Sequence, residues 1–254
     1  MRGDTATEQV LERFGAELAG AVPLVALWVH GSLALGDYQP GRSDLDVLAV
    51  LERAPDAGEL AALTALHQRL ERGSAVAERL HCSYLVAGEL AGAIAGECQL
   101  TWAHRELMER PVTLVTWREL ELGGRCLLGP PPGELTPPVD QAALRAFIRR
   151  DLAEFWLPAT GGWLRWRRDV WVDLGLFTLA RATATLRDGS LLTKSQALDV
   201  LPEFGVSAAL LRDLGRRRQG LPVETGWRWL AHRAQEARRV VRRGAREALA
   251  AYPD

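Results

Sequence analysis

Apolar positions in the first half of the chain switch between helical and strand periodicity. Residues 7–18 repeat apolar side chains at helical spacing, with Val10, Phe14 and Leu18 on one stripe, and Pro23 ends that pattern. The segments that follow predict a strand at 24–29, a short helix opening at 31–35, a strand at 46–51, a helix at 59–71, a strand at 79–86, a helix near 96–109 and a strand at 112–116. This alternation predicts an α/β (α+β) domain with a mixed sheet.

A proline-rich stretch separates this half from the second. Residues 129–138 hold five prolines in ten positions, which cannot continue a helix or a central strand. Beyond it, helical spacing dominates at 141–155, 168–187, 195–201, 208–217 and 225–251. We therefore expect two domains, a mixed α/β domain over 1–135 and an all-α helical bundle over 140–254.

Composition describes a soluble chain with an uneven charge. Of its 254 residues 48% are hydrophobic and 25% charged, with a net charge of −1, which disfavours a protein built to coat nucleic acid. Residues 1–139 hold 11 Arg against 19 acids, a net of −8, whereas the remainder carries +7. An acidic half suits a bound metal and a basic half suits phosphate. The alternative is that both halves have ordinary charged surfaces without a role in binding.

Compartment and membrane association follow from simpler signals. Three cysteines without metal-ligand spacing indicate reduced thiols, and the first residues lack a secretory signal, so we expect a cytoplasmic protein. The apolar stretch 18–35 is interrupted by Pro23, His30, Gly31 and Ser32, so turn and strand punctuation explains it better than a transmembrane helix.

Asp44 and Asp46 provide the clearest candidate chemistry. They lie two residues apart at the start of a predicted strand, and side chains with that spacing share one face. Two aligned carboxylates form an oxygen site suited to Mg²⁺, which takes waters and substrate phosphates as its other ligands. The pair therefore predicts a site for Mg²⁺ and a nucleoside triphosphate.

Small residues around the carboxylates fit the same ligand. Gly31 lets the backbone approach a phosphate, while Ser32 supplies a hydroxyl at the opening of a helix. Ser43, just before the acids, can donate another hydrogen bond. Each piece is weak alone, but together they place a Gly-Ser turn at the end of one strand and two acids at the start of the next.

These motifs resemble the signature of the polymerase-β-like nucleotidyltransferase superfamily: Leu-Trp-Val-His-Gly-Ser at 27–32, then Ser-Asp-Leu-Asp-Val-Leu-Ala-Val at 43–50. The second half is similar to the helical domain of the aminoglycoside 3″/9-adenylyltransferases, at Leu-Ala-Arg 179–181, Asp-Gly 188–189 and Thr-Lys-Ser 193–195. The resemblance spans most of the chain, with long stretches that match only loosely.

The resemblance implies roles for these residues. Asp44 and Asp46 would be the metal ligands, Ser32 and Ser43 would contact ATP, and Arg181 and Lys194 would bind its phosphates. Lys194 is the single lysine of the chain. A compact ammonium acts as a mobile point charge toward phosphate, although a solvated loop residue is the alternative.

One position departs from the family pattern. The family carries on its third strand a glutamate that removes the proton of the attacking hydroxyl, and aligning 79–86 with that strand puts His81 there. A neutral imidazole can act as the base. The alternatives are that Glu78 or Glu89 takes this role, that the site has lost turnover, or that His81 is a hydrogen-bonded structural histidine.

The acceptor site is predicted from tryptophans and acids in the second half. A polycationic drug requires carboxylates and flat apolar walls, and Trp156, Trp163, Trp166 and Trp171 lie among acids there. We expect two of the four tryptophans to be core residues. Trp171 stands where the family has an acid, with Asp173 two residues later, and Trp102 is a further candidate wall residue.

The sequence thus predicts a magnesium-dependent adenylyltransferase. AMP would pass from ATP to a hydroxyl of a small acceptor, either an aminoglycoside or aminocyclitol, as in antibiotic resistance, or another metabolite. The rivals are a nucleotide-binding module without turnover and an enzyme acting on nucleic-acid ends, for which arginine runs such as 216–218 offer weak support. We expect no nucleic-acid or membrane partner and a monomer or weak dimer.

Overall fold

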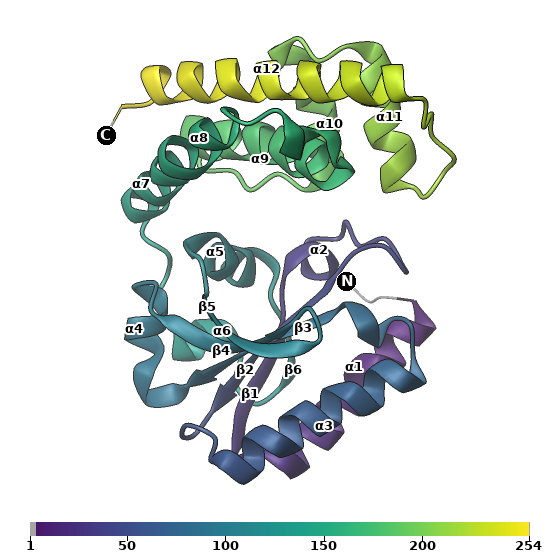
Figure 1. The fold of residues 1–254 in the computed structure, drawn as a ribbon. Helices are drawn as coiled ribbons and strands as arrows, with labels where there is room; N and C mark the ends of the chain where they lie inside the picture. Colours follow the sequence, from purple (N-terminus) through teal and green to yellow (C-terminus); the bar gives the residue numbers. More distant parts are fainter. Residues whose placement is uncertain (1–3, 254) are drawn as a thin grey trace. The chain divides into compact units, whose positions relative to one another are not determined.

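A mixed sheet forms the centre of the N-terminal unit, Met1–Val139, in the computed structural model, which describes residues 4–253 (Figure 1). Within those residues, six strands are hydrogen-bonded in the order β5-β4-β3-β2-β1-β6. They are β1 (Leu24–Val29), β2 (Leu45–Leu51), β3 (Leu80–Val86), β4 (Cys98–Ala103), β5 (Glu106–Pro111) and β6 (Arg125–Leu128). Only the β2–β3 pair is parallel among these strands, so the predicted mixed sheet is confirmed.

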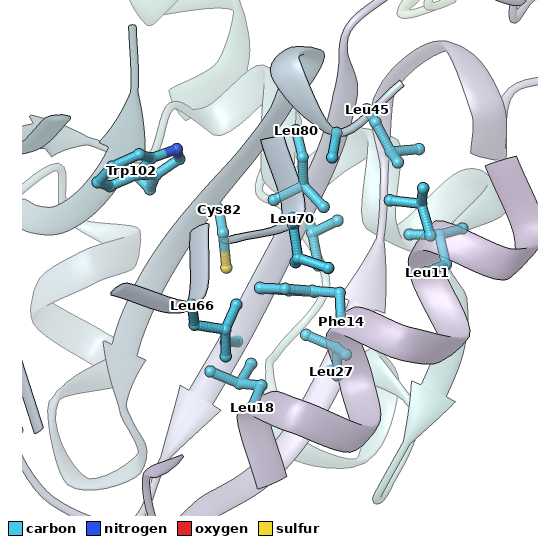
Figure 2. Packing of buried hydrophobic residues seen from close by; sticks show 14 of the residues in the cluster. Leu11, Phe14, Leu18, Leu27, Leu45, Leu66, Leu70, Leu80, Cys82 and Trp102 are labelled. Atoms are coloured by element: carbon cyan, nitrogen blue, oxygen red, sulfur yellow. The ribbon is translucent and has the colours of Figure 1, made fainter. Parts of the chain in front are cut away.

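Two separate apolar clusters cover the two faces of this sheet. Helices α1 (Thr5–Ala21) and α3 (Ala57–Gly73) lie side by side on one face, where Figure 2 shows Phe14, Leu18 and Leu66 packed together. The other face packs against α4 (Leu90–Ile94), α5 (Leu114–Gly123) and α6 (Pro132–Leu135), whereas the short α2 (Gly31–Ala34) contributes Leu33 to the first cluster. The strands are therefore held from both sides, which fixes the strand ends that carry the candidate site.

Polar residues at the helix starts show why these segments begin where they do. Asp56 accepts a hydrogen bond from the Glu59 N–H, and the Glu59 side chain accepts one from the Asp56 N–H, which completes a capping box for α3. Asp4 caps α1 in a similar way by accepting from the N–H groups of Ala6 and Thr7.

Two elements in the region 96–116 differ from the prediction. The expected helix at 96–109 is a hairpin of β4 and β5, and the expected strand at 112–116 is the start of α5, whose N-cap is Thr113. In β4 apolar and polar residues alternate along the strand, so Leu100 and Trp102 point to one face of the sheet. Strand β5 is an exposed edge strand, and it buries too few residues to show a strand pattern in the sequence. A short apolar run such as 112–116 fits either structure.

The described part of the C-terminal unit, Asp140–Asp254, consists of helices joined by loops and contains no strand, which confirms the predicted helical domain class. Its main helices are α7 (Gln141–Arg150), α8 (Leu157–Ala159), α9 (Asp169–Asp188), α10 (Lys194–Val200), α11 (Ala208–Arg218) and α12 (Trp227–Ala251). A π-helical turn, Asp151–Trp156, joins α7 to α8. Helix α9 packs so closely on α12 that a Cβ at Gly244 would lie 2.7 Å from the Leu179 Cδ2.

Membrane insertion finds no support in the helices. Throughout residues 4–253, each helix is either too short or too polar to cross a bilayer. The rejected transmembrane segment at 18–35 contains instead the end of α1, all of β1 and the short α2.

A buried network of ions ties three helices of the C-terminal unit together. Arg217 on α11 donates through Nε to both oxygens of Asp173 on α9, at 3.1 and 3.2 Å. Asp213 accepts from Arg217 and from Arg233 of α12, and Arg233 also pairs with Asp169. Because Arg233 is 1% exposed and Asp213 5%, these charges have lost their water and depend on one another.

Asp213→Ala should therefore lower the free energy of unfolding by about 3–5 kcal/mol, since it leaves two buried guanidinium groups without their shared carboxylate. Urea denaturation followed by circular dichroism measures this loss. Glu247→Ala is the control, because the Glu247 pair with Arg243 is exposed on both sides and should be worth less than ~0.5 kcal/mol. Equal effects of the two substitutions would show that the network does not hold the unit together.

Candidate active site

The two aspartates lie at the N-terminal end of β2 in different surroundings. The Asp44 side chain is 51% exposed, and its Oδ1 lies 3.6 Å from Nη1 of Arg79. Asp46 is the second residue of β2 and its side chain is 30% exposed. Burial raises the pKa of Asp46, and the negative charge of Asp44 adds to this rise.

Gly31 makes room for the Asp46 carboxylate. Its φ is +65°, in the left-handed region that favours glycine, and a Cβ built there would lie 2.5 Å from Asp46 Oδ2. Glycine thus satisfies two requirements at this position, the turn from β1 into α2 and the close approach of a carboxylate.

A row of polar side chains crosses the sheet at this end. The His30 N–H donates to the Asp46 carbonyl at 3.0 Å, and the parallel register of β2 and β3 pairs Asp46 with His81. His81 Nδ1 lies 3.8 Å from Asp46 Oδ1. Behind His30, Glu119 of α5 places Oε2 3.4 Å from its Nδ1. Carboxylates and imidazoles therefore alternate along this row, in the order Glu119, His30, Asp46 and His81.

Burial and neighbouring charges shift the pKa values of Asp46 and His30. Loss of water is the largest influence on Asp46 and raises its pKa, while the imidazoles of His30 and His81 act in the opposite direction. For His30, burial works against the charged form, but the hydrogen bond to Glu119 and the charges of Asp46 and Glu119 outweigh it and raise its pKa. A cation beside Asp46 would relieve the carboxylate of this desolvation.

The predicted serines stand on either side of the aspartates. Ser32 is a partly exposed residue of α2, directly after Gly31. Ser43 belongs to a turn, where its Oγ accepts from the Gln39 N–H at 3.0 Å and its own N–H donates to the Gln39 carbonyl at 2.9 Å. The structure thus brings Gly31, Ser32 and Ser43 to the strand ends that carry the two carboxylates.

Four predicted site residues lie in the C-terminal unit. Arg181 of α9 donates through Nε to the Leu192 carbonyl at 2.7 Å, two residues before the exposed Lys194 at the start of α10. Trp171 is half-buried and stacks on Phe155, with the Arg165 guanidinium 5.0 Å from its ring centroid. Asp173 is held by Arg217 in the ion network. Their roles toward ATP and the acceptor stay predictions.

Trp102 does not fit its predicted role as a wall of the acceptor site. It is 1% exposed, joins the cluster shown in Figure 2, and donates through Nε1 to Glu71 Oε1 at 3.2 Å. Its position on β4 sends the ring to the face of the sheet that α1 and α3 cover. Of the four tryptophans between 156 and 171, Trp156 and Trp166 are buried core residues, which agrees with the expectation for two of them.

Three further residues near the aspartates are not among the predicted site residues. His30 lies inside the quoted glycine-serine motif and could have been found there. Glu119 belongs to α5, which was not recognised as a helix, so no signal pointed to it. Arg79 precedes β3 and also donates to the Arg42 carbonyl at 3.0 Å, which ties the loop before Asp44 to the next strand.

The donor set fits a hard cation that brings its own ligands. Among the residues that the structure describes, no three His, Cys, Asp or Glu side chains converge in a way that could hold a metal. Two carboxylates with a glycine cradle beside them match Mg²⁺, which binds through one or two carboxylates together with substrate phosphates and water.

Comparison with known proteins agrees with this arrangement. Residues 9–89, which contain β1, β2 and β3, match the family model described as "Nucleotidyltransferase domain". The solved structure of spectinomycin adenyltransferase AAD(9) from Enterococcus faecialis, with ATP and spectinomycin, matches with a TM-score of 0.70 and 14% identity, over 92% of this chain and 98% of that one. No curated protein matches. The predicted nucleotidyltransferase fold with a helical C-terminal region is confirmed.

Gly31→Ala should damage the site beyond its effect on stability. An alanine in left-handed conformation costs roughly 1–2 kcal/mol, and its Cβ would also push the Asp46 carboxylate away. Gly41→Ala is the matched control, because Gly41 has a φ of +70° but nothing within 4 Å of a Cβ. Both variants should lose similar stability in thermal melts, but only Gly31→Ala should lose Mg²⁺-dependent ATP binding in calorimetry. Equal ATP binding by both would contradict the role of Gly31.

Proposed function

We propose that the protein transfers AMP from ATP to a hydroxyl group of a small acceptor in a magnesium-dependent reaction. The observation that carries the proposal is the pair of carboxylates, Asp44 and Asp46, beside the Gly31–Ser32 turn. This pair lies within the segment that matches the nucleotidyltransferase domain. We propose 1–135 as the nucleotidyltransferase domain and 140–254 as the helical domain.

In this proposal the chain's own residues position the nucleotide and handle the proton. Asp44 and Asp46 would hold Mg²⁺, which offsets the charge that builds up on the departing pyrophosphate. Ser32 and Ser43 would hydrogen-bond to the phosphates, and Arg181 and Lys194 are assigned to the phosphates by resemblance alone. The acceptor oxygen forms a bond to the α-phosphorus while the bond from that phosphorus to the pyrophosphate oxygen breaks.

His81 is proposed to take the proton of the acceptor hydroxyl. Its Nδ1 faces Asp46, which leaves Nε2 on the side of the ring away from that carboxylate. With Nδ1 protonated and Nε2 unprotonated, the imidazole accepts the proton at Nε2. The two glutamates considered as alternatives fit less well, since Glu89 follows β3 at the end opposite His81 and Glu78 is exposed in the turn before β3.

An aminoglycoside or aminocyclitol is the proposed acceptor. The support is the likeness in fold to an enzyme crystallised with spectinomycin. Trp171 offers a half-exposed aromatic face for a sugar ring, although Arg165 already lies over it. The Asp173 carboxylate is partly neutralised by Arg217, which weakens its attraction for a polycation. A different hydroxylated metabolite is therefore the second acceptor class to test.

A panel assay tests the transfer itself. Incubating the protein with Mg-ATP and separate aminoglycosides, including spectinomycin, should add one AMP to at least one acceptor, as read by mass spectrometry. Asp46→Asn should abolish both the adduct and Mg²⁺-dependent ATP binding, because it removes a metal-binding charge with little change of shape. Glu52→Gln, which removes an exposed carboxylate after the far end of β2, should change neither.

The outcomes of this assay separate the candidate functions. Unchanged ATP binding by Asp46→Asn would remove the central claim. ATP binding without an adduct on any acceptor would favour a nucleotide-binding module, which the replacement of the family's glutamate by His81 also favours. Steeply salt-dependent binding of RNA or DNA would instead favour action on nucleic-acid ends.

Substitutions at His81 test the proton acceptor, using the acceptor found in the panel. His81→Gln should lower kcat by roughly 10²–10⁴-fold with little change in ATP affinity, because it removes the base and keeps a polar side chain. His81→Glu, which restores the family's residue, should keep measurable turnover. His232→Gln controls for the loss of an exposed histidine on α12. Wild-type rates in both His81 variants would rule out this residue as the base.

A further inference from the structure

The turn between β4 and β5 has an unusual backbone for its residues. Within residues 4–253, His104 and Arg105 are the non-glycine residues with positive φ, at 54° and 70°. The pairing of Ala103 with Glu106 leaves just these two residues in the turn. Positive φ at both positions is the type I′ pattern, which strongly favours Asn-Gly. A histidine followed by an arginine is a costly choice there, and such strain tends to persist where the side chains serve a function.

The arginine of this turn is bound to a buried carboxylate, while its own side chain is 67% exposed. Arg105 donates through Nε to Glu71 Oε2 at 3.1 Å, while Trp102 donates to Glu71 Oε1. The Glu71 side chain is only 6% exposed, and the Trp102 ring stacks on His67 with centroids 4.5 Å apart and planes 6° from parallel. The turn is therefore fastened to α3 and to the core of the sheet.

The histidine of the turn reaches the candidate base. The register that pairs Cys82 with Trp102 brings the end of β4 beside the start of β3. There the His104 ring lies with its centroid 5.7 Å from that of His81, at an angle of 66° between planes. His81 is thus contacted by Asp46 from β2 on one side and by His104 from the turn after β4 on the other.

We propose that His104 is a positioning residue that holds the His81 ring in its reactive orientation. Arg105 and Glu71 fasten the turn, and the turn presents His104 against His81. The inference rests on the proposed function in that His81 is taken as the base. His104 itself is not assigned contact with ATP or the acceptor. This role explains why the turn has a histidine at a position where asparagine would be less strained.

His104→Asn separates this role from a merely structural one. Asparagine tolerates left-handed backbone, so the variant should melt at the same temperature as the wild type or higher. Its kcat with the acceptor of the panel should nevertheless fall on the order of 10- to 100-fold with unchanged KM for ATP, because the base is less well oriented. His232→Asn, which removes an exposed histidine from α12, is the control and should leave kcat unchanged.

A spectroscopic measurement decides the ring contact without any acceptor. The chain has five histidines, so carbon–proton correlation spectra of its imidazole groups contain few signals. In His104→Asn, the signal of His104 should vanish and that of His81 should shift, since the neighbouring ring no longer affects it. In His232→Asn, only the signal of His232 should vanish.

The results distinguish the inference from the proposed function. A His81 signal that stays in place, or a wild-type kcat in His104→Asn, overturns the inference even if AMP transfer is observed. A wild-type protein that transfers no AMP overturns the proposed transfer, and the spectra then decide whether His104 holds His81.

Discussion

The candidate site depends on the placement of one carboxylate, that of Asp46. The side chain fits only because Gly31 has no Cβ, and it stands between two imidazoles supplied by the adjacent strands. A buried sheet, covered by helices on both faces, sets the positions of those strands to within a residue. A shift of one residue in the register would turn Asp46 toward the opposite face. The packing of the core therefore also determines the geometry of the site.

The two aspartates differ in a way that suits a shared cation. Asp44 is half-exposed and already faces the Arg79 guanidinium, whereas Asp46 has lost much of its water and has a raised pKa. A carboxylate with this cost gains most from a cation that replaces its lost hydration. The more exposed partner can then adjust with little penalty. This difference in solvation between the two carboxylates favours a metal that binds together with a substrate over a permanently bound one.

Much of the site was predictable, because its signals are local. Glycine and serine follow one strand and the aspartates stand at the start of the next, so these residues are close in sequence and lie at the same end of neighbouring strands. Trp102 could not be judged from sequence, since its exposure depends on which face of the sheet β4 presents. Glu119 could not be predicted as a neighbour of the site for a related reason. Its helix begins with an apolar run that also fits a strand, so its approach to His30 was invisible.

The proposed base, His81, differs from a glutamate in its charge and in how its direction is fixed. A carboxylate at position 81 would stand beside Asp46 in the parallel register and add a negative charge to a site that already holds two. A neutral imidazole adds none. What it lacks is a fixed direction, because a ring that rotates can turn its accepting nitrogen away from the substrate. A histidine therefore needs more orientation from its neighbours than a glutamate does, and two side chains from flanking segments, Asp46 and His104, contact its ring.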